Sequence, residues 1–114
     1  MSTKKQLAIV SRETVDRAAH MLLDAAPEGS EVILFGSYAR GTAGPHSDAD
    51  FLVVEPAVGD AWNESVRLRR YVAAVPLAMD IIVVSRELFD AWKDGVNSVV
   101  ARAHREGRRY ARSA

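Results

Sequence analysis

The chain has 114 residues, no cysteine and a formal net charge of zero, with 15 basic and 15 acidic residues. This length predicts one domain over 1–114 with a modest core, and the lack of cysteine excludes disulfides and cysteine-based zinc sites. The balanced charge gives no reason to expect a nucleic-acid or membrane ligand. No apolar run approaches the ~20 residues that span a bilayer, and the first residues lack the apolar region of a signal peptide. We therefore expect a cytoplasmic protein.

The first elements along the chain are a helix and a strand. Residues 3–10 fit either a short strand or the first turns of a helix. Ser11 is a good N-cap, and apolar residues recur at helical spacing as far as Ala26. We therefore expect a core-packing helix that ends at Pro27-Glu28-Gly29. The apolar run that follows predicts a strand over 31–36.

A turn with polar residues follows this strand. Gly36 lets another group approach the backbone closely. Ser37 is a good N-cap for a short helical turn, whose free N–H groups attract phosphate. Arg40 could present its planar guanidinium to an anion. Each residue also has an ordinary explanation, a tight turn for Gly36-Ser37 and surface exposure for Arg40. Tyr38 either stacks on a ligand or packs against the protein.

A second strand, over 48–55, opens with Asp48 and Asp50. Residues i and i+2 of a strand face the same side, and two carboxylates at that spacing repel by about 2–3 kcal/mol at an effective dielectric near 20. A cation between them would remove this cost, and Mg²⁺ combines one or two carboxylates with water and phosphate oxygens. The alternative is a solvated strand start in which both acids only cap a turn. His46, in the preceding loop, matches no metal-ligand spacing.

The second half predicts a helix over 60–75, stopped by Pro76, and then a strand over 78–84. The buried stripe of the helix is expected to contain Leu68, Tyr71, Val72 and Val75. Asp80 opens the strand. If this strand neighbours the one over 48–55, Asp80 completes a three-carboxylate cluster with Asp48 and Asp50; otherwise it is a simple strand-end acid.

The last part of the chain predicts two helices. Ser85 caps a short helix that runs to about Trp92 and that Gly95 ends. We expect the side chain of Trp92 to fill the core or an interface. A final helix runs from 97 or 98 to about 110. It would carry a basic stripe that we interpret as a solvated face near a helix C-terminus; the alternative is a contact with an acidic partner protein or RNA. The stripe consists of Arg105, Arg108, Arg109 and Arg112.

The order of these elements predicts an α/β (α+β) fold. A small mixed β-sheet would carry the carboxylates on one face, with helices packed on the other face.

The segment FGSYARGTAGPHSDADFLVV resembles the nucleotidyltransferases of the DNA polymerase β superfamily. The matching pattern is G-S-x-A-R-G after a strand, S-D-x-D leading into the next strand, and an aspartate on a later strand, over 32–84. The short chain is similar to the minimal nucleotidyltransferase (MNT) group. The resemblance implies a nucleotide-binding set and a catalytic, metal-binding set. The first is Gly36, Ser37 and Arg40; the second is Asp48, Asp50 and Asp80, with Asp80 also orienting or deprotonating the attacking hydroxyl.

The resemblance also implies a function: Mg²⁺-dependent transfer of AMP from ATP to a hydroxyl of a partner protein. The chain would be the antitoxin of a HEPN/MNT toxin–antitoxin pair, with a HEPN-domain toxin as partner. Two alternatives remain. One is a non-catalytic nucleotide-binding module that neutralises a partner ribonuclease by contact. The other is a small-molecule nucleotidyltransferase of the aminoglycoside-modifying kind. No base-reading motif identifies the nucleobase.

Overall fold

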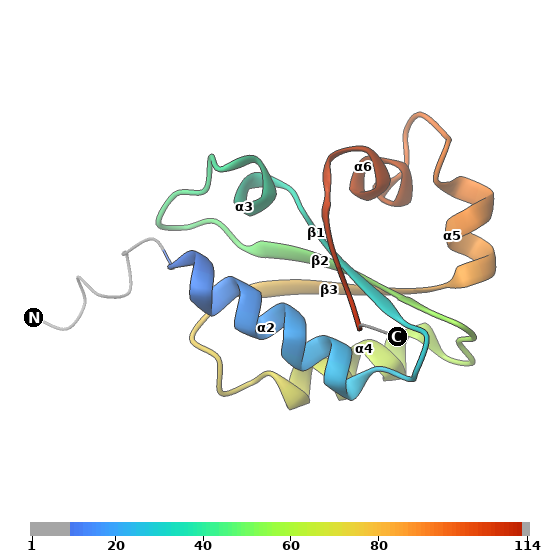
Figure 1. The fold of residues 1–114 in the computed structure, drawn as a ribbon, viewed down its shortest axis with the longest axis horizontal. Helices are drawn as coiled ribbons and strands as arrows, with labels where there is room; N and C mark the ends of the chain where they lie inside the picture. The colour runs from blue at the N-terminus through green and yellow to red at the C-terminus, as the bar shows by residue number, and fades with distance from the viewer. Residues whose placement is uncertain (1–9, 113–114) are drawn as a thin grey trace, which may run out of the picture.

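A four-stranded mixed sheet lies at the centre of the computed structural model, which describes residues 10–112 (Figure 1). The strand order is β3-β2-β1-β4. β1 pairs antiparallel with β2 and β4, whereas β2 and β3 are parallel. The expected small mixed sheet is confirmed. Whether residues 3–10 form a strand or a helix concerns residues that lie almost entirely outside the described part of the chain. The strands are β1 (Glu31–Phe35), β2 (Ala49–Glu55), β3 (Met79–Ser85) and β4 (Arg108–Ala111).

Local capping explains where the longer helices begin. The side chains of Ser11, Asp60, Ser85 and Ser98 each accept a hydrogen bond from a backbone N–H three residues further on. Such caps satisfy N–H groups that the helix leaves without a partner, and each contributes about 1 kcal/mol. No helix in the described part of the chain is long and apolar enough to cross a membrane. The helices are α2 (Arg12–Ala25), α3 (Ser37–Arg40), α4 (Ala61–Tyr71), α5 (Arg86–Trp92) and α6 (Val99–Glu106).

The sheet has an apolar core on each face. Helices α2 and α4 cover one face, as expected, and pack on strand residues such as Val32, Leu34 and Phe51. Helices α5 and α6 additionally cover part of the other face, where Ile33 and Leu52 meet side chains of both helices. Figure 1 shows α2 and α4 below the sheet and α6 above it. Because successive strand residues point to opposite faces, each central strand supplies both cores.

Helix α4 is shorter than expected and its buried stripe is narrower. It ends at Tyr71 instead of residue 75. Leu68, Val72 and Val75 are buried, but Tyr71 is 51% exposed. Val72 is the C-cap and Val75 lies beyond the helix, so both are buried by the turn that follows α4 and only Leu68 belongs to the helical stripe. Trp92, expected in the core or an interface, is 56% exposed and therefore does not belong to the core.

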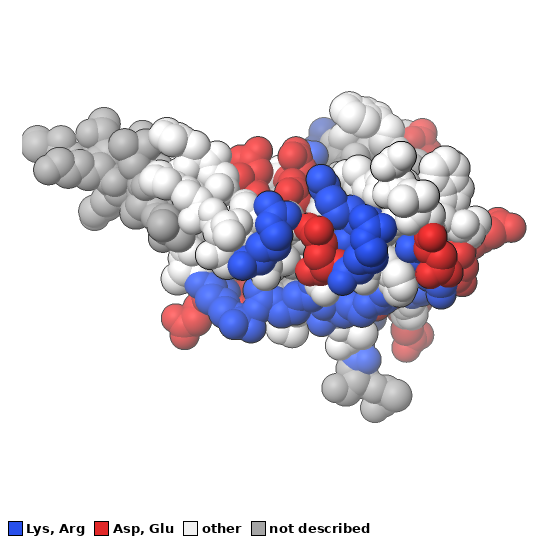
Figure 2. All heavy atoms as spheres, turned by 90° about the horizontal axis from the view of Figure 1, so that it is seen from above, with Lys and Arg blue, Asp and Glu red and all other residues white. Residues whose placement is uncertain are grey.

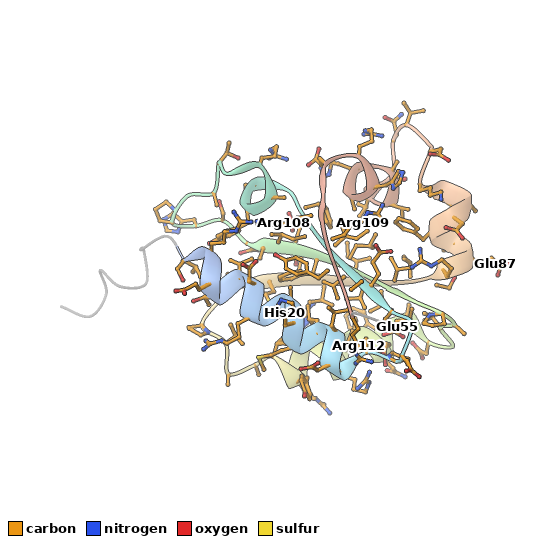
Figure 3. All side chains as sticks on the ribbon, viewed as in Figure 1. His20, Glu55, Glu87, Arg108, Arg109 and Arg112 are labelled. Atoms are coloured by element: carbon orange, nitrogen blue, oxygen red, sulfur yellow. The ribbon has the colours of Figure 1, made fainter. Side chains whose placement is uncertain are left out.

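The expected helix through residue 110 is wrong, because α6 ends at Glu106 and the chain continues as β4. β4 pairs with the edge of β1 that β2 leaves open, so its backbone groups gain ladder hydrogen bonds in place of helical ones. The basic stripe therefore does not exist as a helical face. Its last three members follow one another along β4 and just beyond it (Figure 3); they are Arg108, Arg109 and Arg112.

Two of these arginines, Arg109 and Arg112, have structural partners. Arg109 donates a hydrogen bond from Nη1 to Oε2 of Glu31 at 2.7 Å, and Arg86 donates one to Oε1 at 3.0 Å. Burial alone would raise the pKa of Glu31, but these two hydrogen bonds outweigh it and lower the pKa. Arg112 donates to the backbone carbonyls that end α2. Arg109 and Arg112 are thus exposed, as the interpretation of a solvated face expects, but both are paired and neither lies on a helix.

Glu55, at the end of β2, is only 2% exposed, and its Oε2 has no hydrogen-bond partner among the described residues (Figure 3). Burial raises the pKa of this carboxyl from 4.5 to about 8, and neighbouring Glu64 adds to the shift. Glu64 behaves in the opposite way, because hydrogen bonds from Arg67 lower its pKa to about 2. A neutral carboxyl thus lies beside an ionised one.

Glu55→Gln is expected to remove a pH dependence of stability. Between pH 4.5 and about 8 the folded state keeps a proton on Glu55 that the unfolded chain releases, so wild-type stability falls as the pH rises through this window. The free energy of unfolding of the Gln variant should rise relative to that of the wild type by up to ~1 kcal/mol per pH unit. This difference should level off above the pKa of Glu55 in the folded state. Urea unfolding at a series of pH values measures it. Glu64 does not affect stability in this window. Because its pKa is lowered in the folded state, its contribution to stability is lost only as the pH falls below 4.5. The exposed variant Glu87→Gln is the control, and equal pH profiles for the two variants would contradict the prediction.

Candidate functional site

Two of the expected aspartates lie opposite each other on neighbouring strands. Asp50 of β2 is in register with Asp80 of β3, on the parallel pair of the sheet. Asp48 comes two residues before Asp50, just ahead of β2. By strand alternation, Asp50 and Asp80 point to the face on which α5 and α6 pack. The structure therefore places Asp50 and Asp80 side by side at one end of this face, because their strands are neighbours, with Asp48 two residues before Asp50 along the chain.

The carboxylates disturb one another. The pKa of Asp50 is raised, first by its partial burial and then by the negative charges of Asp80 and Asp48. The positive charges of Arg102 and Arg40 oppose this shift. An ionised Asp50 is thus disfavoured unless positive charge is near it, and a cation at this position would be stabilised. Figure 2 shows basic side chains on both sides of acidic ones on the surface above the sheet.

The turn after β1 closes directly onto Asp50. Gly36 has φ 79° and ψ −155° and is the N-cap of α3, a backbone conformation that is essentially restricted to glycine. A Cβ at this position would also clash with Oδ2 of Asp50. The expected N-cap, Ser37, is instead the first residue of α3, because only glycine allows the chain to turn here. Gly36, Ser37 and Asp50 are therefore held close together.

Arg40, at the end of α3, is exposed and donates a hydrogen bond from Nη1 to Oε1 of Glu106 at 2.9 Å. This ion pair joins the motif turn to the end of α6. Tyr38 is partly buried and packs against the core under α2, which supports packing over ligand stacking as its explanation. It also borders a hollow of about 410 Å³ with Arg12, Arg40 and Arg108. His46 is exposed in its loop.

No pattern in the sequence connected α6 with this site. Glu106 pairs with the motif arginine, and Arg102 is the cation with the larger effect on Asp50. Neither belongs to a recognisable motif, and both are far from the aspartates along the chain. Only the packing of α6 on the carboxylate face connects these two residues with the site, and that packing cannot be read from the sequence.

The donor atoms of the site fit a divalent cation. No three or more His, Asp or Glu side chains between residues 10 and 112 are grouped closely enough to hold a metal ion by themselves. Mg²⁺, however, is usually bound by one or two carboxylates and takes its other ligands from water and substrate phosphates. The in-register pair Asp50 and Asp80, with the charge repulsion that raises the pKa of Asp50, provides that number of carboxylates.

A mixed sheet with paired aspartates beside a Gly-Ser turn is the arrangement expected from the motif. The sequence profile of the nucleotidyltransferase domain matches residues 15–105. The chain therefore belongs to the nucleotidyltransferase domain family, which confirms the resemblance drawn from the motif. No curated protein matches the chain.

Solved structures share the fold. A crystal structure of a toxin–antitoxin with AMP-PNP has a TM-score of 0.54 at 19% identity, over 90% of this chain and 75% of that one. A mutant form of the toxin–antitoxin MntA-HpeT has a TM-score of 0.54 at 17% identity. The match covers 85% of this chain and 72% of that one. A candidate nucleotidyltransferase from Sulfolobus solfataricus has a TM-score of 0.51 at 25% identity. The match covers 74% of this chain and 75% of that one.

Proposed function

We propose that the protein is a minimal nucleotidyltransferase that moves AMP from ATP to a hydroxyl of a partner protein. The observation that carries this proposal is the in-register pair Asp50 and Asp80 beside the Gly36 turn. Membership of the family supports nucleotidyl transfer. The choice of ATP is supported by the similar toxin–antitoxin structure that contains AMP-PNP.

In this proposal the motif residues divide the work between binding and chemistry. Gly36 and Ser37 hold the triphosphate, and Arg40 contributes positive charge to it. Asp48, Asp50 and Asp80 would hold Mg²⁺, which when bound would neutralise phosphate charge. The arrangement leaves room at Gly36, because a side chain there would occupy the space beside Asp50.

The reaction itself needs little beyond positioning and charge neutralisation. The acceptor hydroxyl oxygen forms a bond to the α-phosphorus, and the bond between that phosphorus and the bridging oxygen breaks. Pyrophosphate leaves with the electron pair. Asp80, which is exposed on the edge strand β3, orients the hydroxyl and takes up its proton. An acceptor on another protein can reach this carboxylate from the open edge of the sheet.

The proposed biological role is that of an antitoxin in a HEPN/MNT pair, with a HEPN-domain toxin as the acceptor. Support comes from the two similar structures, both of toxin–antitoxin complexes. Their identity to this chain is low, so they support the fold directly and the partner by analogy.

The test is transfer of label from α-³²P-ATP to protein, with MgCl₂ and a lysate of the host cell. We expect a labelled protein band with the wild type and none with Asp48→Asn/Asp50→Asn, and mass spectrometry of the band identifies the acceptor. The matched control is the double variant Asp90→Asn/Asp94→Asn, whose carboxylates are exposed beyond the site, and it should label as the wild type does.

Two results would contradict the proposal. Toxin neutralisation that persists in Asp48→Asn/Asp50→Asn, with no label transferred by the wild type, would show a module that acts by contact. Transfer to an aminoglycoside in the absence of any second protein would show a small-molecule enzyme.

A further inference from the structure

Arg102 lies on the helix that covers the carboxylate face. Its neighbours Val100 and Ala103 are buried in the core between α6 and the sheet. The guanidinium carbon of Arg102 is 5.4 Å from the centre of the Phe35 ring. Phe35 is the strand partner of Asp50 and directly precedes Gly36. Arg102 is therefore placed over the junction between the carboxylates and the motif turn.

No carboxylate in the described part of the chain is paired with the guanidinium of Arg102. Arg40 and Arg67, in contrast, form ion pairs with Glu106 and Glu64. The ring of Phe35 restricts the guanidinium, so less freedom would be lost when an anion binds.

We propose that Arg102 binds the β- and γ-phosphates of the nucleoside triphosphate. This inference rests on the proposed function. The α-phosphate must lie near Asp50 and Asp80, where the hydroxyl attacks. The remaining phosphates then extend towards the Gly36-Ser37 turn, which is the part of the site that Arg102 overlies. A guanidinium suits this task because its planar fork forms charge-assisted hydrogen bonds to two phosphate oxygens.

Calorimetric titration with ATP and AMP in the presence of Mg²⁺ tests the proposal. Arg102→Ala is expected to lose about tenfold or more in affinity for ATP, the usual effect of removing a hydrogen bond to a charged group. Its affinity for AMP, which lacks the two outer phosphates, should stay at the wild-type value. Arg102→Lys keeps the charge without the fork and should recover part of the affinity for ATP.

The matched control is Arg105→Ala, one turn further along the same exposed side of α6. Arg105 donates to the carbonyl of Gly95 at 3.3 Å, and its removal should leave the affinities for both nucleotides unchanged. Melting temperatures of all variants show whether the fold is retained.

The outcomes separate this inference from the proposed function. If the wild type binds ATP and Arg102→Ala binds it equally well, the role of Arg102 is wrong and the proposed function stands. If Arg102→Ala loses affinity for ATP and AMP to the same degree, Arg102 has a structural role and the proposal is also overturned. If the wild type binds neither nucleotide, both proposals fail together.

Discussion

Asp50→Asn is expected to lower the rate of nucleotidyl transfer by about 10³-fold, because charge stabilisation by a bound metal supplies several kcal/mol and each 1.36 kcal/mol is a factor of ten. Asp50 is central to the carboxylate group, since it is in register with Asp80, two residues from Asp48 and directly beside the Gly36 turn. The amide keeps the size of the side chain and removes its charge.

The same substitution should not destabilise the fold. Burial and the charges of Asp80 and Asp48 disfavour the ionised carboxylate and raise its pKa. A neutral amide avoids this cost, so the melting temperature is expected to equal or exceed that of the wild type. This combination of lost activity and retained stability separates a functional carboxylate from a structural one.

Single-turnover transfer assays and thermal unfolding measure the two effects. Asp94→Asn is the control, because the Asp94 side chain is 84% exposed and lies beyond the site. A fully active Asp50→Asn variant would rule out the proposed chemistry, and a large fall in its melting temperature would show that Asp50 supports the fold.

Gly107→Ala is expected to have the largest effect on stability, a loss of about 3 kcal/mol in the free energy of unfolding, the upper range for overpacking a core. Gly107 joins α6 to β4. A Cβ there would clash with the side chain of Ile33 and the carbonyl oxygen of Ala103. Because one of these atoms belongs to the backbone, the segment at Gly107 would have to move away from β1 and from the last turn of α6.

Urea unfolding measures this loss, and Gly59→Ala provides the comparison. A Cβ on Gly59 would have no neighbouring atom within 4 Å, so its effect should stay within about 0.5 kcal/mol. Equal stability of the two variants would show that the close approach of Gly107 to Ile33 and Ala103 does not exist in solution.

The chain's local patterns determined much of the fold and of the candidate site. Ser11 and Ser85 were recognised as N-caps, because a cap depends on residues only three positions away. Continuous runs of apolar residues indicated the first three strands. The motif around Gly36, Asp48 and Asp50 predicted the family, since its residues lie within one strand–turn–strand unit, and the structure shows Gly36 against Asp50.

Tertiary structure decided what depended on distant partners. Residues 108–111 have no local signal that prefers a strand, and they form β4 because the edge of β1 is available to pair with them. The register of Asp80 with Asp50 follows from the parallel pairing of β2 and β3. The ion pair of Arg40 with Glu106 and the position of Arg102 over Phe35 both require α6 to pack on the carboxylate face. Contacts of this kind are set by how the whole chain buries its apolar surface, which no short segment of sequence specifies.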